Sequence, residues 1–120
     1  MYRYVSKVAV IFGEHVFDGA SIQVDKNGVI VDLERSAMST IVEANGGREA
    51  NADVIVKFNQ TTNRKYMLEG HIYEGKVLTA YWSGQDRCQI LIDFVELSPL
   101  QQYELDLFVE EIKGSCALAS

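Results

Sequence analysis

Cysteine, proline and long apolar runs are all scarce in this sequence. The 120 residues include one proline and two cysteines, and Cys88 and Cys116 stand far apart with no CxxC pair. A disulfide framework and a cysteine zinc site are therefore both disfavoured. No run approaches the roughly 18 apolar residues that a membrane helix needs, and the N-terminus lacks the pattern of a signal peptide. We therefore expect a cytoplasmic protein that does not insert into a membrane.

Basic residues are also in deficit. The sequence has 11 Lys and Arg against 17 Asp and Glu, which gives a formal net charge of −6. Nonspecific binding to a nucleic acid polymer or to an anionic membrane depends on summed positive charge, so this balance disfavours both. It leaves room for a local basic site.

Motifs for catalysis are missing as well. His15 and His71 are far apart, and neither has a ligand-like partner three or four residues away. The sequence contains no Gly-rich phosphate loop, nucleophile elbow or HExxH motif. We therefore expect a binding protein and not an enzyme, with no metal site and no cofactor.

What the sequence does have is the alternation of apolar and polar residues that is typical of β-strands, in at least six segments. The apolar positions are Val8, Val10 and Phe12; Val29, Val31 and Leu33; Val54, Val56 and Phe58; Tyr66, Leu68 and Ile72; Val77 to Trp82; and Ile90, Ile92 and Phe94. Turn signals stand at Asp18-Gly19, Lys26 to Gly28, Asn45 to Gly47, Asn59 to Asn63, Glu74-Gly75 and Ser83 to Asp86, and the longest loop is expected at residues 43–52. With no helical pattern between the strands, a mainly β antiparallel barrel or sandwich is predicted.

The period changes near the C-terminus, where one helix is predicted from Ser98 to Lys113. Ser98 and Gln101 form a capping box around Pro99, and Gly114 is suited to end the helix. The expected apolar face comprises Leu100, Tyr103, Leu107 and Phe108, with Leu105, Val109 and Ile112 beside them. Residues 114–120 are expected to form a tail.

Arg3 and Lys7 precede the first strand, the segment 31–38 (VDLERSAM) follows about 25 residues later, and the last strand, from Cys88, runs into the Leu97-Ser98-Pro99 helix entry. The order of these features resembles the PilZ domain family. The resemblance covers residues 3–113. It implies a six-stranded antiparallel β-barrel with one C-terminal α-helix, formed as a single domain by residues 1–113, of which residues 1–7 would be a flexible arm.

Family members that bind cyclic di-GMP use an RxxxR motif and a [D/N]xSxxG motif. The corresponding residues here read Arg3-x-x-x-Lys7 and Asp32-x-Glu34-x-x-Ala37. Lys7 lacks the planar fork of arginine, the Glu34 carboxylate would repel a phosphate, and Ala37 adds a methyl group where a glycine lets the ligand approach. A register slipped to Glu34-x-Ser36-x-x-Ser39 recovers the serine and still lacks the glycine.

The resemblance leaves three functions open. The first is a non-enzymatic regulatory or adaptor domain in bacterial signalling, in which cyclic di-GMP binding is weakened or lost and another protein is bound through Tyr81 and Trp82 or through the helix surface. The second is a working cyclic di-GMP receptor with a relaxed site. The third is a small-barrel enzyme or an unrelated small-barrel protein-interaction domain. The candidate ligand-binding residues are Arg3, Lys7, Asp32, Glu34, Arg35, Ser36 and Ala37.

Overall fold

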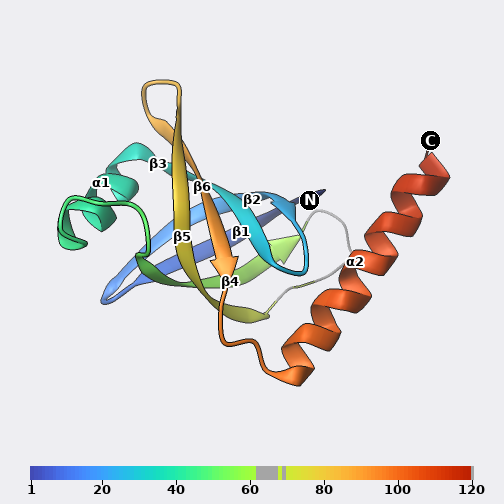
Figure 1. Ribbon diagram of the computed structural model, residues 1–120. Helices are drawn as coiled ribbons and strands as arrows, with labels where there is room; N and C mark the ends of the chain where they lie inside the picture. The colour runs from blue at the N-terminus through green and yellow to red at the C-terminus, as the bar shows by residue number, and fades with distance from the viewer. Residues whose placement is uncertain (62–67, 69, 120) are drawn as a thin grey trace.

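The chain folds into a closed antiparallel β-barrel of six strands with two helices (Figure 1). The computed structural model describes residues 1–61, 68 and 70–119. The strands are β1 (Tyr2–Phe12), β2 (His15–Val24), β3 (Gly28–Glu34), β4 (Asp53–Thr61), β5 (Ile72–Ser83) and β6 (Arg87–Phe94), and the helices are α1 (Arg35–Ala44) and α2 (Pro99–Ala119). Around the barrel the strands follow the order β1-β2-β3-β6-β5-β4. The predicted six-stranded, PilZ-like barrel with a C-terminal helix is confirmed.

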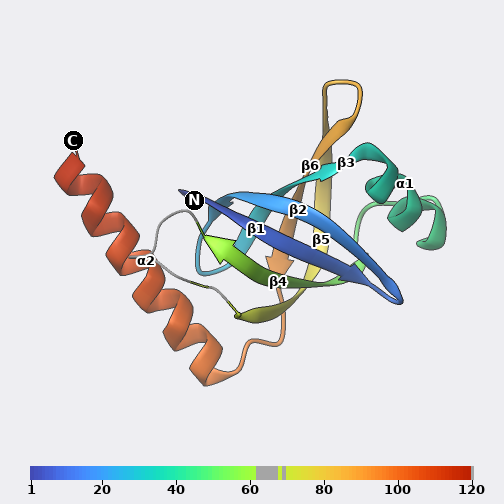
Figure 2. The same cartoon turned by 180° about the vertical axis from the view of Figure 1, so that it is seen from behind.

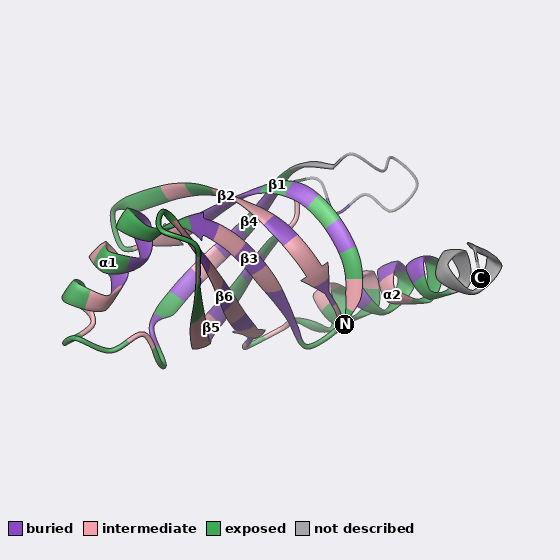
Figure 3. Ribbon diagram, turned by 90° about the horizontal axis from the view of Figure 1, so that it is seen from above, coloured by how far each residue is buried: buried purple, intermediate pink, exposed green. Residues whose placement is uncertain are grey.

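Alternation along the strands places the apolar side chains inside the barrel. In β3 the side chains of Val29, Val31 and Leu33 are fully buried, and in β6 those of Ile90 and Ile92 are too. The buried positions recur at every second residue along these strands, as the view coloured by burial shows (Figure 3). These predicted core positions are therefore confirmed.

Two of the predicted turns lie entirely inside strands, and the turn predicted from Asn59 to Asn63 begins inside β4, with residues 62 and 63 outside the described residues. Gly19 belongs to β2, a strand that was not predicted, and Gly75 belongs to β5. A Cβ atom on Gly19 would lie 2.7 Å from the carbonyl oxygen of Asp32, so glycine is needed there because β3 approaches closely. A glycine that accommodates a neighbouring strand looks like a turn signal when only the sequence is read.

The strand predicted from Tyr66 to Ile72 is not found as such. Tyr66 lies outside the described residues, and Leu68 is buried but belongs to no strand. Ile72 is the first residue of β5. The predicted number of strands is correct because β2, which was overlooked, takes the place of this segment.

The helix α1 was not predicted, since the sequence between the strands was interpreted as free of helical pattern. The helix buries Ala37, Met38 and Ile41 against the barrel. Its last two residues and its C-cap, Asn45, lie within the segment 43–52, where the longest loop is expected from the sequence. The helix starts after Glu34, which makes no side-chain capping bond. The most recognisable signal of a helix start is therefore missing here.

The helix α2 begins as predicted and ends later. The Ser98 amide donates to Oε1 of Gln101 at 2.9 Å, and the Gln101 amide donates to Oγ of Ser98 at 3.1 Å, so the capping box is confirmed. The helix continues through Gly114 to Ala119, which corrects the predicted end at Lys113 and the predicted tail. No helix within the described residues is both long and apolar enough to cross a bilayer.

The two helices lie at opposite ends of the barrel (Figures 1 and 2). The helix α2 contacts the barrel through Phe108, whose ring meets the edge of the Tyr4 ring at 4.7 Å between centroids. Leu105 and Ile112 are buried on the same side of the helix. Leu100, Tyr103 and Leu107 of the predicted apolar face remain exposed, so only part of that face packs against the barrel.

Candidate functional site

The outer face of β1, β2 and β3 brings two of the predicted site residues into one row. Lys7 of β1 is paired with Ala20 of β2, and Ala20 is paired with Asp32 of β3. Since neighbouring strands lie about 4.8 Å apart, the backbones of Lys7 and Asp32 are separated by about 10 Å. Lys7 is exposed and Asp32 is half-buried. Two segments that are distant in the sequence therefore share one surface.

A groove of about 740 Å³ lies on this surface. Its lining includes Lys7 from β1, Glu34 from the end of β3 and Arg87 from the start of β6. The small residues Gly19 and Ala20 contribute from β2. The remaining lining residues are Val8, Asp18 and Asn59.

The formal charges of the residues that line this groove cancel. Lys7 and Arg87 are positive, whereas Asp18 and Glu34 are negative. Nε of Arg87 lies 3.2 Å from Oδ1 of Asp32, so the cation nearest to Asp32 is already paired. With Asp32 included, two positive and three negative charges give a local net charge of −1. The groove therefore offers no surplus of positive charge to an anion.

Arg87 is a site residue that the sequence interpretation missed. It becomes a neighbour of Asp32 only because β6 pairs with β3, and 55 residues separate the two in the chain. Neither a motif nor a local spacing marks it. The same pairing sets Arg87 opposite Glu34.

Arg3 lies within a strand and not in a flexible arm, because β1 begins at Tyr2. It is exposed and is paired with Gln23, beyond an irregularity in the β1–β2 register that separates it from Ser6. It does not line the groove that contains Lys7. The structure therefore places the two cations of the predicted Arg3-x-x-x-Lys7 motif on one strand and only one of them at the groove.

A buried serine pair occupies the irregular part of the β1–β2 register. Oγ of Ser21 accepts from the Ser6 amide at 3.0 Å and donates to the Tyr4 carbonyl at 2.7 Å. Because its one hydrogen is used in this way, the Ser6 hydroxyl must donate to Ser21 across their 2.7 Å contact. The pair thus satisfies backbone groups at the point where β1 carries an extra residue.

The residues of the second predicted motif are divided between a strand end and a helix. Ala37 is buried against the barrel, so its methyl group faces the core and not a ligand. Arg35 and Ser36 instead border a second hollow of about 580 Å³, together with Ser39, which belongs to the slipped register. Oγ of Ser39 donates to the carbonyl of Arg35 at 3.0 Å.

The Arg35 guanidinium is directed toward the hairpin of β5 and β6. Its central carbon lies 4.8 Å from the centre of the Trp82 ring, and Nη1 donates to the Gln85 carbonyl at 3.3 Å. The Arg35 amide also donates to the Asp86 carbonyl at 2.8 Å. These contacts join the start of α1 to the hairpin, and they engage Arg35, one of the candidate ligand-binding residues.

Tyr81 and Trp82 are both about half-exposed, at 58% and 50% of their surface. The hairpin of β5 and β6 projects from the barrel (Figure 1). As successive residues of β5, Tyr81 and Trp82 point to opposite faces of it. Trp82 faces Arg35, whereas Tyr81 is paired with Gln89 in the row that also contains Asp32. The two rings therefore form no single aromatic patch.

A polar cluster at the end of the barrel next to α2 joins β5 to that helix. The hydroxyl of the fully buried Tyr73 lies 3.1 Å from Nδ1 of His71 and 3.5 Å from Oε2 of Glu104. Nδ1 of His71 is 3.4 Å from the same carboxylate oxygen. Burial, and then the charge and the hydrogen bond of Glu104, raise the pKa of Tyr73 well above its usual range. This cluster helps to position α2.

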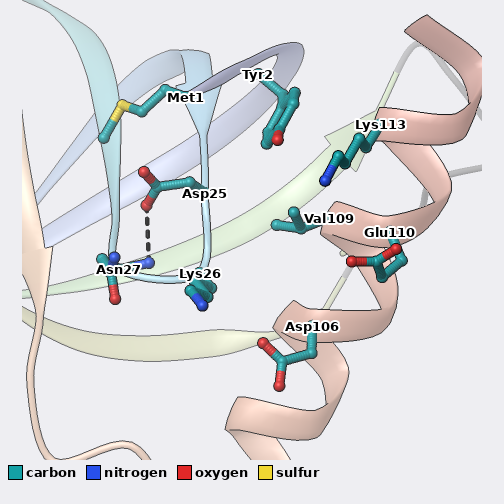
Figure 4. Close-up of a pocket in the computed structure, with 9 residues that line it drawn as sticks. All are labelled: Met1, Tyr2, Asp25, Lys26, Asn27, Asp106, Val109, Glu110 and Lys113. Atoms are coloured by element: carbon teal, nitrogen blue, oxygen red, sulfur yellow. Dashed lines mark hydrogen bonds between the residues drawn. The ribbon is translucent and has the colours of Figure 1, made fainter. Parts of the chain in front are cut away.

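A separate cleft of about 550 Å³ lies between α2 and the turn that joins β2 to β3 (Figure 4). Asp106 and Glu110 border it on the helix side. On the barrel side, Oδ1 of Asp25 accepts from the Asn27 amide at 2.7 Å. The cleft contains none of the predicted ligand-binding residues. Among the described residues, no group of three or more His, Cys, Asp or Glu gathers as a metal site would require.

Comparisons with known proteins support the fold and do not identify a function. No family model matches the sequence, and no curated protein matches it. A crystal structure of the PlzA protein of Borreliella burgdorferi in complex with c-di-GMP is similar in structure, with a TM-score of 0.57 at 11% sequence identity. The similarity covers 93% of this chain and 47% of that one, so the chain spans about half the length of PlzA. At this identity the likeness concerns the fold alone.

Proposed function

We propose that this chain is a non-enzymatic PilZ-like regulatory adaptor domain of bacterial signalling, in which cyclic di-GMP binding is weakened or lost. The barrel and its likeness to a structure that contains c-di-GMP motivate the comparison with this ligand. The adaptor role is argued from the groove on β1, β2 and β3, where the predicted ligand residues are only partly assembled.

The local charge is the observation that carries the proposal. Cyclic di-GMP bears two negatively charged phosphodiesters, and the groove with Asp32 has a net charge of −1. Two like charges 4 Å apart repel by about 1 kcal/mol in a water-like dielectric, which corresponds to about fivefold in affinity. Glu34, which stands where the family motif has serine, therefore weakens binding of an anion. Arg87, the arginine that lines the groove, is already paired with Asp32.

The geometry of the motif residues supports the same proposal. Ala37 is buried, Arg35 contacts Trp82, and Arg3 lies outside the groove lining. Lys7 and Glu34 are the two candidate residues that line the groove, and their charges are opposite. Specific binding of guanine edges and phosphates needs several donors that converge, and such a set is not assembled here.

Isothermal titration of the full chain with cyclic di-GMP tests the proposal. We expect no binding, or binding weaker than micromolar. Micromolar or tighter binding that is abolished by Lys7→Ala, which removes the lysine of the groove, or by Arg3→Ala would overturn the adaptor proposal. The Lys57→Ala variant serves as a matched control, because Lys57 is an exposed lysine of β4 that lines none of the pockets described above.

The relaxed receptor is the second candidate, and the shared row of Lys7 and Asp32 favours it. For a receptor, Glu34→Ser should tighten cyclic di-GMP binding by about fivefold or more, since it removes one negative charge from the groove. The affinity of the wild-type chain separates the two candidates, and the variant tests whether Glu34 lies at the ligand. An unchanged affinity would argue that this segment does not contact the ligand.

A further inference from the structure

The helix α2 has apolar residues on two sides, and the barrel covers only one of them. Leu105, Phe108 and Ile112 are buried against the barrel. On another side, Leu100 and Leu107 are 65% and 48% exposed. Exposed leucines that recur on one side of a helix are unusual unless a partner covers them.

The exposed residues follow the spacing of a helix–helix seam. Leu100, Tyr103 and Leu107 are separated by three and then four residues, as are successive a and d positions of a heptad. Tyr103 is 61% exposed at the centre of this row. Tyrosine is a favoured anchor of protein interfaces, because its ring buries a large area at low entropic cost. We call these three residues the α2 seam.

Acidic residues outnumber cations beside the α2 seam, where Lys113, at the next g position, is the one cation among the described residues. In the same heptad, Asp106 falls at a g position, Glu111 at an e position and Glu110 at the next d position. All three are exposed, and no salt bridge among the described residues engages them. Asp106 and Glu110 also border the cleft beside the barrel (Figure 4). A fourth acid, Glu104, occupies an e position and contacts His71.

These charges decide against a second copy as the partner. Residues at e and g positions face their counterparts across a helix pair and determine which partners associate. Two α2 helices paired along this seam would set acids opposite acids, and like charges in such positions are destabilising. A partner with basic residues beside an apolar row would instead place cations against Asp106 and Glu111.

We propose that the α2 seam is the docking surface for a basic amphipathic helix of a partner protein. The partner contributes an apolar row that covers Leu100, Tyr103 and Leu107, and lysines or arginines that pair with the acids on either side. This assignment rests on the proposed adaptor function, because it names the surface and the class of partner through which the adaptor acts. The complementary charges provide selectivity and a fast association, whereas the apolar row provides most of the affinity.

Fluorescence anisotropy with two designed helical peptides tests the proposal on the full chain. Both peptides have leucine at a and d positions; one has lysine at e and g positions and the other has glutamate. We expect the lysine peptide to bind and the glutamate peptide not to bind, with weaker binding of the lysine peptide at high salt. Equal binding of the two peptides, or no binding of the lysine peptide, would overturn the proposal.

Matched variants locate the peptide on the helix. Leu107→Ser should weaken binding of the lysine peptide by about tenfold, since the removed side chain would otherwise be buried in the complex. Leu78→Ser is the control, because Leu78 is also 48% exposed and belongs to β5. A charge-reversed variant, Asp106→Lys with Glu111→Lys, should bind the glutamate peptide in place of the lysine peptide. If Leu78→Ser weakens binding as much as Leu107→Ser, the seam is not the binding surface.

Three further outcomes bear on this inference, and the last two keep it separate from the proposed function. If sedimentation equilibrium shows a dimer that Leu107→Ser dissociates, a second copy is the occupant and the inference is wrong. Tight cyclic di-GMP binding with intact binding of the lysine peptide would refute the loss of nucleotide binding alone. Absence of both kinds of binding would refute the docking inference alone. Circular dichroism of each variant verifies that α2 is still folded.

Discussion

Replacement of Ser21 by alanine should destabilise the barrel far more than the same replacement of its neighbour Ser6. Both side chains are buried, at 0% and 3% exposure, and they bond to each other. Ser21 also accepts from the Ser6 amide and donates to the Tyr4 carbonyl. Each substitution removes one serine hydroxyl from the same buried pair, yet the two substitutions remove different numbers of hydrogen bonds.

The magnitudes follow from the groups left without a partner. Ser21→Ala deprives one buried amide, one buried carbonyl and the Ser6 hydroxyl of their partner. At about 1–2 kcal/mol for each of the two backbone groups, the free energy of unfolding should fall by about 2–4 kcal/mol. Ser6→Ala removes one hydrogen bond and leaves the other two bonds of Ser21 intact, so it should cost about 1 kcal/mol.

Urea denaturation followed by circular dichroism measures both values, and the double variant completes a cycle. In the Ser21→Ala background the Ser6 hydroxyl is already without its partner, so its removal should cost nothing further. Equal losses in the two single variants would refute the reasoning. So would losses that add in the double variant.

Two further predictions concern the barrel and the cluster beside α2. The raised pKa of Tyr73 means that the unfolded chain loses this proton first as the pH rises above about 10, so the native state loses stability by up to about 1.4 kcal/mol per pH unit there. Tyr73→Phe should abolish this contribution, and unfolding measured between pH 8 and 11 should show a shallower decline for the variant than for the wild type. Gly19→Ala should destabilise the barrel by about 1–3 kcal/mol, because the added Cβ would lie 2.6 Å from Cδ2 of Leu33. A melting temperature within about 1 °C of the wild type would contradict this close approach.

Much of the barrel could be predicted because its determinants are local. Alternation identified the inward-facing residues of β3 and β6, and the capping box fixed the start of α2. The errors came from residues whose role depends on neighbours distant in the chain. Asp18-Gly19 predicts a turn, which is wrong because the sequence does not show that β3 passes close to Gly19. The helix α1 was overlooked because no side chain caps it, although Ala37, Met38 and Ile41 have helical spacing and Asn45 donates to the Ile41 carbonyl at its end.

The candidate site was less predictable than the fold. The sequence identified Lys7 and Glu34, which do line one groove, but it gave no indication of Arg87. It also suggested Ala37 as a ligand contact, whereas the first turn of α1 directs that side chain into the core. A sequence motif specifies how far apart its residues lie along the chain. Which residues surround the motif in space depends on the segments that pack against it.

The sequence by itself determined that this chain forms a small, mainly β domain followed by a capped helix, because side-chain alternation and capping operate within a few residues. Only the tertiary structure decided that Asp32 is paired with Arg87, that Arg35 contacts Trp82, and that Leu107 stays exposed while Phe108 is buried. These contacts depend on which strands become neighbours when the barrel closes and on where α2 meets it. Such neighbours are chosen by the packing of the whole core and leave no local signature.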